Sequence, residues 1–541
     1  METSDAEADA TPPSEDLTTE GSASASDHTA SVARGGTANL VGAVVYGASG
    51  FALLLVLNRG LGVHNAGIVV VAIAIFNILT VVAGLGTSTG LVRTIARLRA
   101  TGHPEEIPTM LRVALIPVTI VSVIAGVGLW ACAPWLAEIF SHGQGTAEVA
   151  GVLRAMAPFV PFATLHTVIV QATRGFDTMV PQVTIEKIGR SLAIPCLAAG
   201  AAAFGCGPRG VAVAWAASNV VALALSWRAL STRVKRAVEA AERPTPPPQR
   251  THHREFWAFT GPRGVAQTAI VAVNWFDTIL VGAILSTTAA GIYASGTRYL
   301  LPGLFAADAL VQVTSPRLSG LLSTGQSKDA SKLVQTVGGW QVTVMWPIYL
   351  IIALFPIPLL RVFGPEVVQA KGALVALSLA MLLTSPLGPS GAVILMAGRG
   401  RMAMFNTLVV LAVNVVGNLL FVKHFGITAA GVVWAVTIIT TEGLTGWQAN
   451  RTLGIRTVGR PAVTGVVVSA LTIGVVGGAV RLTMGDDLGG LLVAGSLGGA
   501  LYLAGLWKFR SAMQLDAWWS GIRGRSNSDA PAGAIPAQGT S

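Results

Sequence analysis

The sequence has few charged residues for its length: Asp, Glu, Lys and Arg make up 11% of its 541 residues. A soluble protein carries about 25% charged residues, because they cover its surface. Hydrophobic residues instead make up 52% of the chain, and the mean hydropathy is +0.64. This composition excludes an ordinary soluble globular protein and predicts an integral membrane protein.

Cysteine and catalytic motifs are also scarce. The three cysteines lie in apolar segments without the paired spacing of zinc ligands, and their odd number argues against a disulfide framework. The sequence has no Walker phosphate-binding loop, and no long loop between its apolar segments offers room for a sugar-nucleotide site. We therefore predict a protein that is not an enzyme and that needs no cofactor and no metal.

Basic residues outnumber acidic ones, giving a net charge of +10, but they lie in short clusters between apolar runs. A basic stripe with interleaved aromatic residues is missing, so we predict no nucleic-acid partner. The clusters follow the even-numbered apolar runs, whereas loops after odd-numbered runs hold fewer basic residues. Because Lys and Arg in short loops stay in the cytoplasm, we predict a multi-pass protein of the cytoplasmic membrane with both termini in the cytoplasm.

Fourteen apolar runs are long enough to cross a hydrocarbon layer of about 30 Å as helices of roughly 20 residues. These runs are 36–58, 66–90, 108–131, 152–172, 179–204, 208–227, 257–285, 289–313, 336–358, 367–390, 397–422, 426–449, 459–482 and 488–508. Prolines inside several of them are tolerated, because neighbouring helices can satisfy the freed carbonyls. The predicted fold class is an all-α polytopic membrane protein with about 14 transmembrane helices.

The two halves of the chain resemble each other at offsets of 224 and 225 residues. The matched pairs are AGI at 66–68 and 290–292, Arg93 and Arg317, VIVQATRG (168–175) and VILMAGRG (393–400), and Pro161 and Pro386. An even number of spans in each half gives both halves the same orientation. We therefore predict two six-helix lobes related as parallel repeats, with a binding cavity between them near the midplane of the membrane.

The polar segments divide the chain further. We predict a disordered cytoplasmic tail at 1–34, which is acidic and has almost no large apolar residues, and a second such tail at 511–541. The segment 228–255 is basic and proline-rich, which is typical of a linker and suits anionic lipid head groups. The predicted lobes and additional helices are then the N-terminal lobe 35–227, the C-terminal lobe 256–450 and two extra transmembrane helices in 451–510.

The segment 256–300, FWAFTGPRGVAQTAIVAVNWFDTILVGAILSTTAAGIYASGTRYL, resembles the start of the C-terminal half of polysaccharide-export flippases. There, a helix that ends in D-x-x-x-x-G precedes a helix that begins A/V-G-x-Y-x-x-A. The matching residues are Asp277, Gly282, Gly291, Tyr293 and Ala294, and TSPRLSGLL (314–322) is similar to the loop that closes the next helix.

This resemblance is to the oligosaccharide flippase (Wzx-like) branch of the multidrug/oligosaccharidyl-lipid/polysaccharide exporter (MOP) superfamily. It implies two six-helix lobes, two extra C-terminal helices, and translocation of a polyprenyl-diphosphate-linked oligosaccharide to the outer leaflet for cell-surface polysaccharide synthesis. The arginine–aspartate signature of peptidoglycan lipid-precursor flippases is absent from the first span, NLVGAVVYGASGFALLLVLNRG (39–60).

Carrying a diphosphate through hydrocarbon requires cations and hydrogen-bonding groups within the membrane. The candidates among the ionisable residues inside the spans are Arg112, Lys187, Arg190, Arg298, Glu186, Asp277, Asp308 and Glu442. We expect Arg298, Arg190, Lys187 and Asn274 to bind the substrate. We expect Asp277 and Asp308 to couple transport to a proton or a sodium ion.

Two pairs among these residues have alternative roles. Glu186 and Arg190 are four residues apart, so they either neutralise each other or leave Arg190 to bind phosphate. Asp277 and Arg298 lie at a similar predicted depth, about 15 Å from the hairpin turn between their helices. They either form a structural pair or have separate functions, in which Arg298 binds the diphosphate and Asp277 binds the proton or sodium ion.

Two other functions are weighed against the flippase. One is an ion-coupled multidrug or small-molecule antiporter, which would need a differently charged cavity. The other is a membrane component of a glycan polymerase or ligase complex, which would need a large extracellular loop that the sequence lacks. The expected partners are the lipid-linked substrate, membrane lipids and other glycan-assembly proteins.

Overall fold

The computed structural model describes residues 42–141, 145–240 and 251–514, without the side chains of residues 251, 252, 273 and 274. Every regular element in these ranges is a helix, and the ranges hold no strand. The all-α polytopic fold predicted from the sequence is confirmed. The predicted tail at 1–34 lies outside the described residues, as does the tail at 511–541 beyond its first four residues.

The N-terminal lobe runs from Gly42 to Glu239 and begins with the helix Gly42–Leu61. Its further α-helices are α2 (Val63–Ala83), α3 (Thr87–Ala100), α4 (Ile107–Ser141), α5 (Thr146–Met156), α6 (Val160–Ala172), α7 (Ser191–Ala203) and α8 (Gly207–Glu239). Between them lie the 3-10 helices η1 (Pro104–Glu106), η2 (Ala157–Phe159) and η3 (Thr173–Phe176) and the π-helix η4 (Gln182–Arg190).

The C-terminal lobe runs from Thr251 to Leu453. Its α-helices are α9 (Thr251–Ile284), α10 (Thr287–Thr297), α11 (Leu301–Ser323), α12 (Ser327–Leu354), α13 (Pro356–Arg361), α14 (Lys371–Thr384), α15 (Ser390–Met396) and α16 (Gly400–Leu453). The 3-10 helices are η5 (Arg298–Leu300), η6 (Pro365–Ala370) and η7 (Ser385–Leu387). The chain ends with α17 (Arg460–Ser469), the π-helix η8 (Ala470–Val475), α18 (Val476–Met484) and α19 (Leu488–Lys508).

Ten helices of the described ranges are long and apolar enough to cross a membrane, by length and composition, and the two parts of α9, which meet at a bend of 55°, pass the same test together. One of the ten, α16, breaks at Gly426 (φ 63°) and covers the predicted spans 397–422 and 426–449. The predicted spans 179–204 and 289–313 are covered by η4 with α7 and by α10 with α11. The described chain therefore has a helical segment for each of the fourteen predicted spans.

Both lobes interrupt one helix at equivalent places. In the N-terminal lobe, η2 separates α5 from α6, and Pro161 follows it; in the C-terminal lobe, η7 separates α14 from α15 and contains Pro386. The start of α5 at Thr146 and the start of α14 at Lys371 have the same offset of 225 residues as the two prolines. Because proline removes a backbone donor, the chain leaves regular α geometry at both places. The internal repeat in the sequence is thus accompanied by a repeat of helix breaks.

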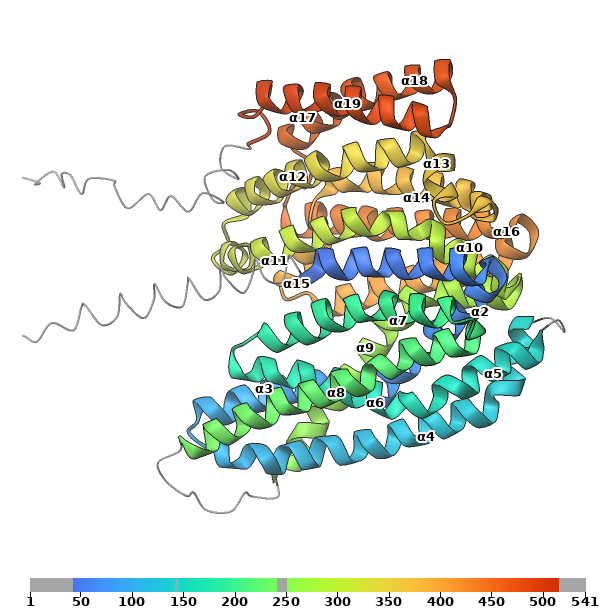
Figure 1. The fold of residues 1–541 in the computed structure, drawn as a ribbon. Coiled ribbons are helices and arrows are strands. Elements are labelled where there is room, and N and C mark those ends of the chain that lie inside the picture. The colour runs from blue at the N-terminus through green and yellow to red at the C-terminus, as the bar shows by residue number, and fades with distance from the viewer. Residues whose placement is uncertain (1–41, 142–144, 241–250, 515–541) are drawn as a thin grey trace, which may run out of the picture.

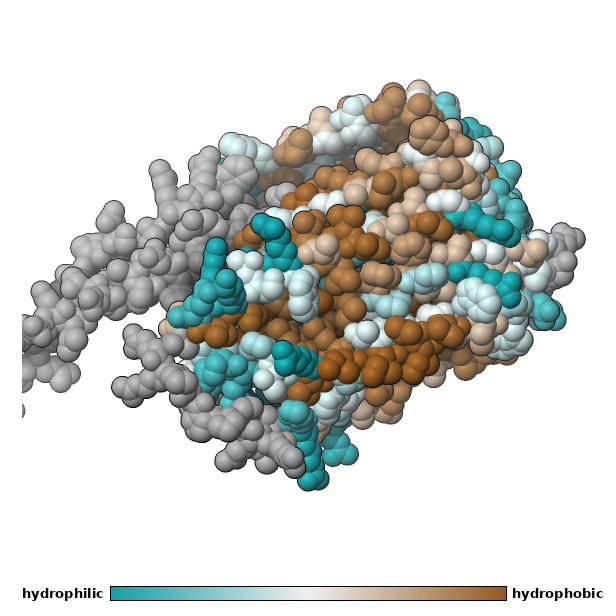
Figure 2. All heavy atoms as spheres, turned by 60° about the horizontal axis from the view of Figure 1, so that its bottom comes forward, coloured by the Kyte–Doolittle hydropathy of each residue, from teal (hydrophilic) through white to brown (hydrophobic). Residues whose placement is uncertain are grey.

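The lobes lie side by side with their long helices running in roughly the same direction (Figure 1). The last helices, α17 to α19, form a separate layer that packs on α12 at the edge of the C-terminal lobe (Figure 1). Figure 2 shows apolar side chains over a broad middle band of one face, with hydrophilic side chains gathered towards the two ends of the helices. This pattern is the one expected for a protein surrounded by hydrocarbon.

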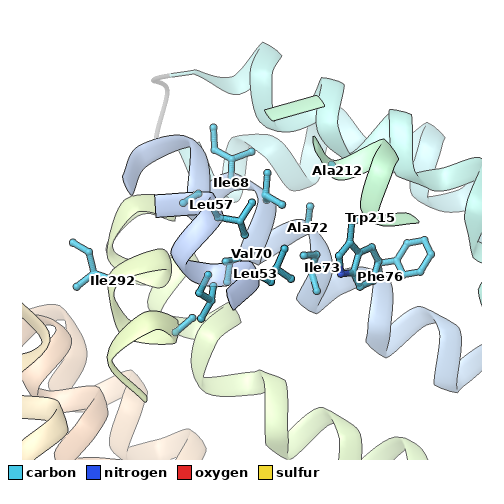
Figure 3. Close-up of a cluster of buried hydrophobic side chains, with 14 of the residues drawn as sticks. Leu53, Leu57, Ile68, Val70, Ala72, Ile73, Phe76, Ala212, Trp215 and Ile292 are labelled. Carbon is cyan, nitrogen blue, oxygen red and sulfur yellow. The ribbon is translucent and has the colours of Figure 1, made fainter. Parts of the chain in front are cut away.

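The largest buried cluster joins the first helices of the chain to both lobes. Figure 3 shows side chains of the helix Gly42–Leu61 and α2 beside Trp215 of α8 and Ile292 of α10. Phe76 and Trp215 meet edge to face, with ring centroids 5.4 Å apart. Between helices in lipid such close van der Waals packing replaces the hydrophobic driving force, so this cluster fixes the first two helices against both lobes.

The predicted linker 228–255 is shorter in the structure than in the sequence-based prediction. Helix α8 continues to Glu239, and α9 begins at Thr251. Residues Arg228–Glu239 contain no proline or glycine and follow the apolar part of α8 without a helix-breaking residue, which explains why the helix extends beyond the predicted span. The rest of the linker, 241–250, lies outside the described residues.

Candidate functional site

The helix Gly42–Leu61 lies between the two lobes, and its glycines allow the close approach. A Cβ atom at Gly42 would stand 3.2 Å from side-chain atoms of Val183 and Lys187 in η4 of the N-terminal lobe. A Cβ atom at Gly47 would stand 2.6 Å from the Phe305 ring in α11 of the C-terminal lobe. Groups on this helix therefore face elements of both lobes.

Arg298 lies at a break in the helix that follows. It opens the 3-10 helix η5 between α10 and α11, four residues before Pro302, which has no N–H to bond the carbonyl of Arg298. A Cβ atom at Gly50 would stand 3.8 Å from Nη1 of Arg298, so the guanidinium points to the helix Gly42–Leu61. The side chain is partly buried, and no ion pair between described residues includes it. The interior of the protein thus holds a cation without an acidic partner.

Arg190 occupies a comparable position on the N-terminal lobe. It ends the π-helix η4, and its guanidinium lies over the Trp215 ring, 5.6 Å from the ring centroid, a cation–π distance. Its Nε is buried without a hydrogen-bond partner. Single π-helical turns are rare and concentrate at functional sites.

The first alternative for Glu186 and Arg190, an ion pair on one helix face, is not formed. Their charged groups interact electrostatically but lie beyond the 4.0 Å of a salt bridge, and Oε2 of Glu186 is buried without a hydrogen-bond partner. The prediction assumed an α-helix, whereas this segment is a π-helix in which Ser191 Oγ donates to the Glu186 carbonyl at 3.1 Å. The second alternative, in which Arg190 binds phosphate, stays a prediction.

Tyr46 lies near both arginines and was not predicted from the sequence. It lies on the helix Gly42–Leu61, within electrostatic range of Arg190 and Arg298, and meets Phe305 edge to face at a centroid distance of 6.5 Å. Its side chain is half exposed, so space remains beside it. A tyrosine within an apolar run gives no sequence signal, because its neutral ring is as common in packing as in binding.

Asp277 forms a separate polar cluster inside the C-terminal lobe. Its carboxylate is buried and accepts hydrogen bonds from Asn418 Nδ2 at 3.0 Å and from the Tyr293 hydroxyl at 3.4 Å. Asn418 also donates to the carbonyl of Asn414 at 2.9 Å, and its own Oδ1 is buried without a partner. No ion pair of the described residues includes Asp277, so the structural pair with Arg298, one of the two alternatives, is absent. Side chains of α10 and α16 thus supply the hydrogen bonds to this carboxylate of α9.

The other predicted site residues take different positions. Lys187 packs beside Gly42 in η4, next to Arg190 in the same segment. Asp308 is exposed on α11, and no hydrogen bond in the described ranges joins it to the Asp277 cluster. The side chain of Asn274, at the bend of α9, lies outside the described residues. The structure therefore brings Arg190, Arg298 and Lys187 to one helix and keeps Asp277 apart from them.

The lobes touch at one end through the first turns of α2 and α10. Gly67 and Gly291 are in direct contact, and a Cβ atom on Gly291 would stand 2.7 Å from Cα of Gly67. Close by, His64 Nδ1 lies 2.9 Å from Thr288 Oγ1, and Asn58 Nδ2 donates to Ser295 Oγ at 2.9 Å. Arg59 adds hydrogen bonds to the carbonyls of Arg361 and Val362 at 2.9 and 3.1 Å.

A second set of contacts joins the lobes at the opposite end, where α3 meets the first half of α9. Arg97 Nη1 lies 2.5 Å from Glu255 Oε1, and Gln267 Nε2 donates to Thr89 Oγ1 at 2.9 Å. A Cβ atom at Gly264 would stand 2.7 Å from the backbone carbon of Leu85, so the two helices cross at backbone contact. The site around Tyr46 is held between these two sets.

Known structures share the fold of this protein. The fold is similar to that of a lipid II flippase, MurJ, in an inward closed conformation, with a TM-score of 0.68 and 13% identity over 88% of this chain and 98% of that chain. It is also similar to a multidrug resistance MATE family transporter of the MOP superfamily in its inward-facing conformation, with a TM-score of 0.54 and 15% identity over 76% of this chain and 94% of that chain. At these identities, the likeness establishes the fold.

The family follows from the sequence match. Residues 32–322, more than half of the chain, match the family described as polysaccharide biosynthesis protein. A comparison with curated proteins gives no match. The protein therefore belongs to the polysaccharide biosynthesis protein family.

Proposed function

We propose that this protein is a flippase that moves a polyprenyl-diphosphate-linked oligosaccharide from the inner to the outer leaflet, for cell-surface polysaccharide synthesis. The observation that carries the proposal is the pair of arginines around Tyr46, one from each lobe, with no carboxylate in salt-bridge range of either among the described residues. A charged group inside a membrane costs at least about 3 kcal/mol unless it is paired or hydrated. A bound anion would offset that cost.

A diphosphate suits this pair of cations. A guanidinium presents parallel N–H donors that match two phosphate oxygens, and two guanidiniums supply donors for both phosphates. Lys187 and Tyr46 would add a further cation and a hydroxyl on the side of the N-terminal lobe. The family match to polysaccharide biosynthesis proteins and the fold shared with a lipid II flippase support a substrate of this class.

Ion coupling is assigned to the Asp277 cluster. A buried carboxylate with an amide and a phenol as its neighbours offers oxygen ligands to a small cation and a basic oxygen to a proton. Asn418 Oδ1, buried without a partner beside it, would complete such a site. Asp308 is exposed, so we retain it as a secondary candidate for the same role.

Alternating access requires that the two sets of contacts between the lobes form in turn. When the contacts around Gly67 and Gly291 form, one side of the protein would be closed. The contacts around Arg97 and Glu255 would then break, and the other side would be open. We place the Arg97 end in the cytoplasm, together with both termini, from the distribution of Lys and Arg.

Depletion of the protein tests this function in its cell. We expect lipid-linked oligosaccharide to accumulate on the inner leaflet of the cytoplasmic membrane while surface polysaccharide falls. Drug hypersensitivity with normal surface polysaccharide would favour the multidrug antiporter. This alternative is included because the protein shares its fold with a MATE family transporter. Accumulation on the outer leaflet would favour a component of a polymerase or ligase complex.

A further inference from the structure

A groove of about 870 Å3 opens at one end of the N-terminal lobe, apart from the site around Tyr46. Three segments distant in sequence line it: the end of α3, the turn that follows η3 and the end of α8. Its charged lining residues are Arg99, Asp177, Arg233 and Arg236, and four alanines and Phe176 form much of the remaining wall. The groove therefore has three cations and one acid.

The single acid does not neutralise this groove. Asp177 Oδ2 lies 2.6 Å from Arg99 Nη1, so this carboxylate is taken up by one arginine. Arg233 Nη1 donates to the carbonyl of Ala229, and the side chain of Arg236 makes no hydrogen bond or ion pair with a described residue. Arg233 and Arg236 lie close enough to repel each other. Such a like-charge pair attracts an anionic partner.

The chain enters the lobe beside this groove. Gly42, the first described residue, packs against Val183, which lies five residues after the groove residue Thr178. Five residues span at most about 18 Å, so Gly42 lies within roughly 20 Å of the groove. Every segment that precedes Gly42 is therefore tethered next to it.

The preceding segment has the complementary charge. Residues 1–34 contain eight acidic residues and a single basic residue, Arg34. Asp27, the last of these acids, is 15 residues before Gly42, a stretch that reaches up to about 50 Å. All eight carboxylates can therefore reach the groove without any rearrangement of the lobe.

We propose that the acidic N-terminal segment 1–34 docks in the groove formed by α3, α8 and the turn after η3, with its carboxylates on Arg233 and Arg236. Tethering gives the segment an effective concentration in the millimolar range, which favours it over freely diffusing anions such as phospholipid head groups. The alanine wall suits a segment rich in Ser, Thr and Ala, whose small side chains allow close approach.

The repeat supplies a matched control for this proposal. Thr324, at the end of α11, occupies the position equivalent to the groove residue Ala100 at the end of α3, with the offset of 224 residues, and both are exposed. At the offset of 219 residues that relates Trp215 to Trp434, the equivalents of Arg233 and Arg236 are Thr452 and Ile455. The C-terminal lobe therefore presents the same backbone position without the arginines of α8.

Disulfide cross-linking in the full-length protein tests the docking. In a variant without the three native cysteines, reconstituted in phosphatidylcholine vesicles, Ser14→Cys is combined with either Ala100→Cys or Thr324→Cys. We expect the bond to Ala100→Cys to form at least about tenfold faster, and we expect Arg233→Gln with Arg236→Gln, or 1 M salt, to remove the difference, because screened or absent charges no longer hold the segment.

Equal rates at the two positions would overturn the proposal, as would a difference that persists without the two arginines. The same cross-linking is repeated in vesicles that contain phosphatidylglycerol. If the difference disappears when this anionic lipid is present, lipid head groups occupy the groove and the docking of segment 1–34 is refuted. A difference that persists in both vesicle types supports docking.

Discussion

Gly67 and Gly291 occupy equivalent positions in the two halves of the sequence, and the folded protein places them against each other. Gly291 lies next to Gly67 and the Val63 carbonyl, and Gly67 lies next to the carbonyl of Thr287, which is the repeat equivalent of Val63. Equivalent residues of the two halves of the sequence therefore meet in this contact. Helices that cross without side chains between them can approach at backbone distance, which would suit the alternating access that we propose.

Gly67→Ala tests whether this contact is required. The added methyl would collide with the Thr287 carbonyl, and such overpacking costs about 1–3 kcal/mol, so we expect a lower thermal unfolding temperature in detergent and slower transport. Gly128→Ala on α4 is the control, because a methyl there would meet nothing within 4 Å. We expect that change to be neutral or to stabilise by up to about 1 kcal/mol. Equal behaviour of the two variants would show that the glycine contact has no role.

Arg298→Ala should abolish export while the amount of protein in the membrane stays unchanged. The guanidinium has no ion-pair partner among the described residues, so its removal strands no buried carboxylate. A charged hydrogen bond contributes about 1.5–3 kcal/mol, which corresponds to a loss of roughly 10- to 100-fold in substrate affinity. Arg361→Ala, a second arginine of the C-terminal lobe, is the control. Full export by Arg298→Ala, measured as surface polysaccharide, would remove Arg298 from the site.

Asp277→Asn should separate transport from its coupling ion. The amide keeps the size of the side chain but loses the charge that would hold a cation or a proton, so we expect transport to lose its dependence on an imposed sodium or proton gradient. Asp308→Asn tests the secondary candidate, which is exposed and apart from Asn418 and Tyr293, and we expect a smaller effect on this dependence. If Asp277→Asn responds to both gradients as the parent protein does, the coupling site lies elsewhere.

Asp486→Asn should loosen the last pair of membrane helices. Oδ2 of Asp486, between α18 and α19, lies 3.4 Å from Arg481 Nη2 and 3.8 Å from Lys371 Nζ, and Oδ1 accepts from the backbone N–H of Ile357 at 3.4 Å. Loss of these partners should cost about 1–3 kcal/mol, measured as a lower unfolding temperature. Asp329→Asn, which removes only an exposed pair with Lys332, should cost less than about 1 kcal/mol. A larger effect of Asp329→Asn would contradict this ranking.

The helical segments of the fold could be predicted from the sequence, and so could the position of Arg190 and Arg298 within them, because apolar runs and ionisable residues inside such runs are strong signals in a membrane protein. Tyr46 could not, since its importance depends on Arg190 and Arg298, which lie 144 and 252 residues further along the chain. The partners of Asp277 were equally hidden: Asn418 is 141 residues away, and its spacing to Asn414 shows only that they share a helix face.

Local geometry explains the predictions that needed correction. The sequence around Glu186 has ordinary helical spacing and no signal that predicts a π-helix. A salt bridge with Arg190, one of the two alternatives, therefore assumed the wrong helix type. The predicted linker began too early because a charged helix beyond the membrane has the composition of a loop. In both cases, the helix type or the end of the helix depends on backbone hydrogen bonds, which the residue types alone do not determine.

Translocation by the purified protein tests the central claim most directly. A fluorescent polyprenyl-diphosphate saccharide is placed in both leaflets of proteoliposomes, and a quencher that cannot cross the membrane is added outside. The decrease of fluorescence is followed with time, because label from the inner leaflet is quenched only after it reaches the outer leaflet. We predict that the parent protein exchanges the lipid between leaflets, and that Arg190→Ala with Arg298→Ala reduces the rate to that of protein-free liposomes. Exchange by the double variant at the parental rate, or none above protein-free liposomes by the parent protein, would contradict the account.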